Sequence, residues 1–114
     1  MASTETKILA DCLGQGLKLT DAAEYPADAI VSKTLLNKAV GTITLFAFDA
    51  GQSLSEHTSP YDAVVQVLEG KASLTIGGQQ QDVGAGELIV MPANVPHSVD
   101  AEEKFKMLLT MIRG

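Results

Sequence analysis

The chain has two histidines, His57 and His97. Imidazole is the side chain best suited to metal binding and to proton transfer near neutral pH. His57 closes the segment Gly51-Gln-Ser-Leu-Ser-Glu-His57, shortly before an apolar run that begins at Ala63. His97 directly follows Pro92-Ala-Asn-Val-Pro96, in which two prolines restrict the backbone. Two imidazoles in these places predict a metal site, a general base, or a pair of neutral hydrogen-bonded pocket residues.

The segments that position both histidines have the pattern of short strands. From about Ala29 onward, apolar or alternating runs recur, each closed by Gly, Pro, Asn or Asp. This spacing predicts an all-β sandwich or barrel. Gly77-Gly78, between two of the runs, is a two-residue hairpin signal. The expected strands are 29–36, 42–48, 53–58, 63–68, 72–76, 79–83, 87–91, 98–101 and 105–112.

Strand alternation predicts which side chains share a face. Ser55, His57 and Ser59 fall on one face of their strand, while Glu56 and Thr58 fall on the other. In the last strand, Phe105, Met107, Leu109 and Met111 alternate with Lys106, Leu108, Thr110 and Ile112. One set must line the interior, so the other needs a cover, either the N-terminal arm or a partner subunit.

The sequence predicts a separate N-terminal arm over residues 1–28 and the barrel over residues 29–114. Ile8, Leu9 and Cys12 have helical spacing, whereas Gly14, Gly16 and Pro26 interrupt any longer helix. We therefore expect one short helix or an edge strand here.

Composition limits the class of protein. The 114 residues fit one domain, and 46% hydrophobic with 19% charged residues excludes a disordered chain. A net charge of −6 argues against nucleic acid or an anionic membrane as partner. The N-terminal residues lack the features of a signal peptide, and Cys12 has no second cysteine to pair with. Together these features predict a cytoplasmic protein.

The two histidine segments resemble those of a small single-domain cupin of the RmlC-like, cupin 2 conserved-barrel type. The first family motif is Gly, five residues, His-x-His, three or four residues, Glu, six residues, Gly, and here Gly51, His57 and Gly70 match it. The second is Gly, five residues, Pro-x-Gly, two residues, His, three residues, Asn, and here Gly86, Pro92 and His97 match it. The resemblance covers about residues 40 to 112. It implies a double-stranded β-helix, or jelly-roll, barrel.

The departures from the motifs concern the metal ligands. Ser59 stands where the family has its second His, Ala63 replaces the Glu, Asn94 replaces a Gly and Ala101 replaces the Asn. A complete site holds a divalent metal with three His and one Glu, so the resemblance leaves His57 and His97 and implies a vestigial or weak site for Zn, Fe, Mn or Ni. The side chains that remain as replacements for the missing His and Glu ligands are Glu56, Asp62, Gln66 or Asp100.

A metal-free acid–base site is the alternative chemistry. A pocket His can act as general base, with Tyr61 or Asp62 as the acid, as in the sugar-nucleotide epimerases among cupins. Those enzymes need arginine clamps for diphosphates, and this chain offers Arg113 and Lys33, which argues against an anionic sugar nucleotide.

We therefore expect a small cupin that binds a small, neutral or weakly polar organic molecule inside its barrel. A metal-dependent dioxygenase, decarboxylase or isomerase is the alternative. The resemblance and the leftover apolar strand face both predict a homodimer. The expected pocket residues are Ser55, Ser59, Tyr61, Gln66, Met91, Phe105 and Met107.

Overall fold

The computed structural model describes residues 4–113; residues 1–3 of the predicted arm and Gly114 of the predicted barrel lie outside the described residues. The described part confirms the predicted all-β barrel, with a strand at each of the expected places. The strands are β1 (Ile30–Lys38), β2 (Gly41–Phe48), β3 (Ser53–His57), β4 (Asp62–Glu69), β5 (Lys71–Ile76), β6 (Gln79–Gly84), β7 (Leu88–Met91), β8 (His97–Asp100) and β9 (Phe105–Ile112).

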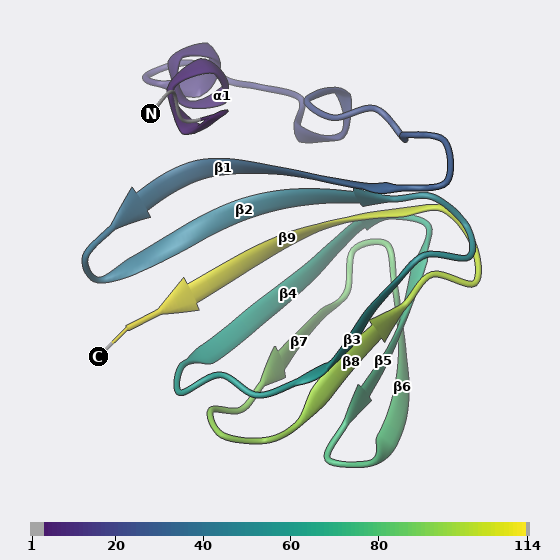
Figure 1. The fold of residues 1–114 in the computed structure, drawn as a ribbon. Coiled ribbons are helices and arrows are strands. Elements are labelled where there is room, and N and C mark those ends of the chain that lie inside the picture. The colour runs from purple at the N-terminus through teal and green to yellow at the C-terminus, as the bar shows by residue number, and fades with distance from the viewer. Residues whose placement is uncertain (1–3, 114) are drawn as a thin grey trace.

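The strands form two antiparallel sheets that face one another (Figure 1). The first has the order β1-β2-β9-β4-β7 and the second the order β3-β8-β5-β6. Alternate side chains from both sheets fill the space between them, which explains the period of two in the sequence. Phe48 and Phe105, both 0% exposed, stack at the centre of this core with ring centroids 4.4 Å apart.

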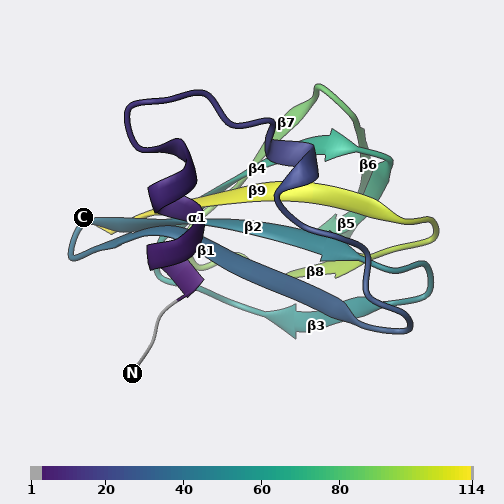
Figure 2. The ribbon, with the colours of Figure 1, turned by 90° about the horizontal axis from the view of Figure 1, so that it is seen from above.

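The N-terminal arm covers part of the outer face of the five-stranded sheet. It contains α1 (Thr4–Cys12) and a 3₁₀ turn (Leu19–Asp21), and Figures 1 and 2 show it lying over β1, β2 and β9. Ile8 and Ala23 of the arm pack with Leu45 and Ala47 of β2 in a second apolar cluster. This layer explains the alternation in β9, since Phe105 and Met107 point into the barrel while Leu108 packs against the arm.

The predicted hairpin at Gly77-Gly78 joins β5 and β6. Both glycines have positive φ, 57° and 81°, as a two-residue turn of the primed type requires. Within residues 4–113, no helix is both long enough and apolar enough to cross a membrane.

Candidate functional site

His97 begins β8 and is held by the loop that precedes it. Its side chain is 4% exposed, so it belongs to the barrel interior. The backbone N–H of Gly77 donates to the carbonyl of Pro96 (2.8 Å), and that of Asn94 donates to the carbonyl of Ser59 (2.7 Å). Asn94 has φ 64°, a left-handed conformation that asparagine tolerates in place of the family's glycine. The loop thus fixes the backbone from which His97 projects.

His57, at the end of β3, faces His97 because β3 is irregular. Leu54 pairs with Val99 and His57 pairs with His97, so three steps along β3 match two steps along β8. The extra residue turns His57 toward the side that Leu54 already faces. The alternation expected from the sequence was therefore wrong for this strand: Ser55 and His57 do not share a face.

The two imidazoles meet edge to face at Nε2. The Nε2 atoms lie 3.1 Å apart, and the ring planes make an angle of 72°. Nδ1 of His57 is 2.8 Å from the carbonyl oxygen of Ser55, and Nδ1 of His97 is 3.1 Å from that of Val95. A carbonyl only accepts hydrogen bonds, so the tautomer with hydrogen on Nδ1 satisfies both contacts, and in that tautomer the Nε2 lone pair of each ring faces the other ring.

Two of the predicted pocket residues, Ser59 and Tyr61, lie in the connection that follows His57. Ser59, half-buried in the β3–β4 connection, accepts a hydrogen bond on Oγ from the backbone N–H of Tyr61 (3.2 Å). Tyr61 is half-buried, and the guanidinium carbon of Arg113 lies 5.9 Å from its ring centroid. Asp62 accepts the backbone N–H of Ala93 on Oδ1 (2.8 Å), which ties this connection to the loop before His97.

The remaining predicted pocket residues lie elsewhere. Phe105 (0% exposed), Met107 (1%) and Met91 (4%) are packed in the core, so they do not line open space. Gln66 is exposed on the outer face of β4, since its neighbours Val65 and Val67 point inward. Ser55 is exposed and contributes its carbonyl to His57.

His57 and His97 lie in the two segments that resemble the cupin motifs, and the comparison with protein families identifies the same family. The cupin domain model matches residues 44–113. The chain belongs to the cupin family.

Two solved structures and one further protein are similar to this chain. A conserved protein of unknown function from Streptococcus pyogenes is 39% identical, with a TM-score of 0.84 over 88% of each chain. A cupin 2 conserved barrel domain protein from Leptotrichia buccalis is 42% identical, with a TM-score of 0.83 over 85% of this chain and 47% of that one. An uncharacterised Streptomyces coelicolor protein is 36% identical over 61 residues, 54% of this chain and 55% of that protein. This cupin therefore spans about half the length of two of these relatives.

The spacing of the two histidine Nε2 atoms of this cupin is compatible with a metal ion, whereas Ser59 and Ala63 stand at the other two ligand positions of the first motif. Two nitrogens that bind one ion at roughly 2.0–2.1 Å lie about 2.9–3.4 Å apart in octahedral or tetrahedral geometry, and the observed 3.1 Å falls in this range. Among the described residues, however, no group of three or more His, Cys, Asp or Glu side chains could hold an ion. The donor set among the described residues is thus limited to the two imidazoles.

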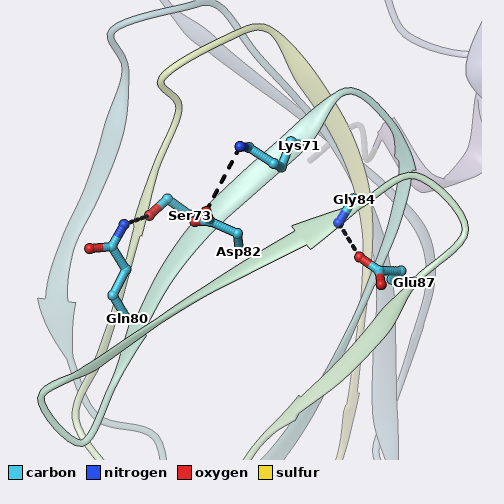
Figure 3. A network of polar contacts seen from close by, with 6 residues as sticks. All are labelled: Lys71, Ser73, Gln80, Asp82, Gly84 and Glu87. Carbon is cyan, nitrogen blue, oxygen red and sulfur yellow. Dashed lines mark hydrogen bonds and ion pairs between the residues drawn. The ribbon is translucent and has the colours of Figure 1, made fainter.

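A polar hollow that the sequence did not suggest lies on the other side of the four-stranded sheet. Ser73 is 5% exposed and accepts a hydrogen bond from Nε2 of Gln80 at 2.8 Å (Figure 3). Only the strand register reveals this grouping, because the sequence alone does not align β3, β8 and β5. The hollow measures about 450 Å³ and is lined by Gly51, Gln52, Ser53, Ser73, Thr75, Gln80, Asp100, Ala101 and Glu102.

Tyr25, Glu69 and Lys106 form a polar cluster between the arm and the outer face of the sheet, and the pKa values of Tyr25 and Glu69 are shifted. The Tyr25 hydroxyl donates to Oε1 of Glu69 (2.6 Å), and Nζ of Lys106 lies 3.2 Å from the same oxygen. The hydrogen bond from Tyr25, followed by the contacts with Lys106, holds the pKa of Glu69 below its ordinary value. Burial, together with the hydrogen bond and charge of Glu69, raises the pKa of Tyr25. These groups fasten the arm and do not belong to the histidine site.

Proposed function

We propose that this cupin binds a divalent metal ion through Nε2 of His57 and Nε2 of His97, and that this ion anchors a small organic molecule at the same end of the barrel. The observation that carries the proposal is the 3.1 Å approach of the two Nε2 atoms, each on a ring whose Nδ1 faces a carbonyl. This arrangement fixes both rings in the tautomer that binds metal at Nε2.

Each histidine has a different part in the site. His97 is buried and held by the rigid loop before it, so it provides a fixed ligand. His57 is exposed at the end of β3, so it leaves the metal open to solvent and to an incoming molecule. A divalent ion at this place would polarise a bound oxygen as a Lewis acid. With two protein ligands the site has more open positions than the three-ligand sites of catalytic zinc, which favours binding a chelating molecule.

Metal analysis of the tag-free protein tests the proposal. Protein dialysed to equilibrium against Mn, Fe, Ni or Zn should retain near-stoichiometric metal in the wild type once the free metal exceeds its Kd. We expect His57→Ala and His97→Gln each to weaken metal binding at least tenfold. Glu56→Ala changes an exposed neighbour of His57 and should retain the metal.

Thermal unfolding adds a second readout. A metal at about 100 times its Kd stabilises the folded state by about 2.7 kcal/mol, and the shift should disappear in both histidine variants. A wild type that retains none of the four metals, or retains equal amounts in the histidine variants, would contradict the proposal.

A further inference from the structure

The polar hollow on the outer face of the four-stranded sheet is separate from the histidine pair. Leu74 and Val99 point into the core, so their neighbours Ser73 and Asp100 point outward. The hollow lies where β3 begins and β8 ends, at Ser53 and Asp100, whereas the histidines lie at the opposite ends of these two strands. Its volume of about 450 Å³ is in the range of small-molecule sites. The hollow is therefore a second candidate binding site.

The strand register gathers carboxylate and hydroxyl groups in this hollow. Asp100 lies directly opposite Ser53 of β3 and directly opposite Ser73 of β5. Opposed side chains of antiparallel strands have Cβ atoms about 4.5–5.5 Å apart, so one carboxylate and two hydroxyl groups share a small area. Glu102, in the turn after β8, lines the same hollow with a second carboxylate.

Backbone hydrogen bonds hold the two turns that border the hollow. The N–H of Gly51 donates to the carbonyl of Ala101 (2.7 Å), and the N–H of Ala101 donates to the carbonyl of Gln52 (2.8 Å). These bonds join the turn before β3 to the turn after β8. The lining side chains therefore project from a fixed frame, which lowers the cost of ordering them when a ligand binds.

Ser73 is the most buried polar side chain of the hollow, since it is 5% exposed although it lies on the outer face of the sheet. Nε2 of Gln80 donates to its Oγ at 2.8 Å (Figure 3). This bond uses the acceptor side of the hydroxyl, and Ser73 donates no side-chain hydrogen bond to any residue that the structure describes. The hydroxyl hydrogen is therefore available to an oxygen atom of a ligand.

The charged side chains of the hollow are both negative. Asp100 and Glu102 line it, and none of its lining residues is Lys, Arg or His. Within residues 4–113, neither carboxylate takes part in an ion pair. Lys71, on the same face of β5 as Ser73, pairs with Asp82 instead, with Nζ 3.8 Å from Oδ2 (Figure 3). Two carboxylates without a cation favour a positively charged ligand.

We propose that the hollow binds a small hydroxylated ammonium ion, such as an amino sugar, whose ammonium group meets Asp100 and Glu102 while an oxygen atom accepts from Ser73. An ammonium group has three N–H donors and needs only acceptors around it. A metal ion suits the hollow less well, because the described residues contain no group of three or more His, Cys, Asp or Glu that could hold one. This inference does not depend on the function proposed for the histidine pair.

Titration of glucosamine into ¹⁵N-labelled protein, followed by heteronuclear NMR without added metal, tests the inference. At about pH 6 the amine is protonated and the carboxylates are ionised. We expect the largest shift changes at the backbone amides of Ser53, Ser73 and Asp100. Glucose lacks the ammonium group and cyclohexylammonium lacks the hydroxyl groups, so each should bind about tenfold more weakly than glucosamine.

Substitutions of the two carboxylates provide the second test. Asp100→Asn and Glu102→Gln each remove one charge from an exposed position, and each should weaken glucosamine binding about tenfold. The matched control is Glu103→Gln, which removes a charge from the same exposed turn but outside the hollow, and it should bind within about twofold of the wild type.

Three results would overturn the inference. The first is a wild type that binds no glucosamine, or binds it with the largest shift changes away from the hollow. The second is equal binding of glucosamine and either analogue. The third is an equal loss in Glu102→Gln and Glu103→Gln, because the carboxylates would then act only through the net negative charge of the protein.

Discussion

Lys106 is the one buried cation among the described residues, with 7% exposed, although it lies on the outer face of β9. Its Nζ donates to the carbonyl of Thr20 (2.6 Å), contacts Glu69 and lies 4.7 Å from the Tyr25 ring centroid. A buried ammonium group is costly unless its donors are satisfied, so these three contacts explain how it is tolerated. They also attach the arm to the barrel.

Removing the Tyr25 hydroxyl should make this attachment weaker and less dependent on pH. We expect Tyr25→Phe to lower the free energy of unfolding by about 1 kcal/mol at neutral pH, a discounted value because Glu69 is 40% exposed. The hydrogen bond lowers the pKa of Glu69, so its contribution is complete above the unfolded pKa, about 4.3, and is lost as the pH falls through the lower folded pKa.

Urea unfolding near neutral pH and at about pH 2.5 measures this difference. The gap between wild type and Tyr25→Phe should shrink at the acidic pH. Tyr61→Phe makes the same chemical change away from Glu69 and should show no such pH dependence. A gap of equal size at both pH values would contradict the assignment.

The strands were predictable because each carries its own local signal, but the site depended on how strands are aligned. The Gly-Gly hairpin and the alternation in β4 and β9 were enough to define those elements. In contrast, the irregularity of β3 has no marker in Ser55-Glu56, so the facing of His57 appears only when β3 is paired with β8. The contact of Tyr61 with Arg113, just after β9, is equally long-range, and it brings together residues more than fifty positions apart in the sequence.

The arm behaves as an element that is stabilised mainly by packing. A helix of the length of α1 is marginal alone, so its burial against the sheet must support it. Ile8 is 5% exposed in the second apolar cluster, whereas Leu13, just after the helix, is 72% exposed. The two residues therefore form a matched pair of large apolar side chains in opposite environments.

We expect Ile8→Ala to lower the free energy of unfolding by about 2 kcal/mol, because it deletes buried methyl groups and leaves a cavity under the arm. Leu13→Ala should change it by less than about 0.5 kcal/mol. Urea unfolding followed by circular dichroism measures both. Equal effects of the two substitutions would show that the arm does not pack on the sheet as described.

The whole molecule has two unlike outer faces. The four-stranded sheet presents polar side chains, among them Ser53, Asp100 and Gln80 around the hollow. The outer face of the five-stranded sheet carries apolar side chains beside Gln66 and Lys106, and the arm covers only part of it. Beyond the arm, Leu88 and Val90 of β7 are 56% and 46% exposed, and Ile112 of β9 is 62% exposed. Exposed apolar side chains gathered on one sheet face are typical of a protein–protein contact.

The homodimer expected from the sequence remains a prediction, and this face is where we place it. Val90 lies opposite Val64 of β4, so a second copy related by a twofold axis would cover both. Light scattering after size exclusion should give twice the mass of the chain for the wild type. Val90→Lys should give the mass of one chain, since it places a charge within the contact.

Val40→Lys is the control for that experiment, because Val40 is 69% exposed in the β1–β2 turn, away from β7. It should remain dimeric. A wild type that elutes as one chain at about 100 µM, a concentration at which a weak dimer of Kd near 10 µM would still be mostly assembled, would exclude this contact. A dimer that survives Val90→Lys would place the interface on another face and leave the exposed part of the five-stranded sheet without a partner.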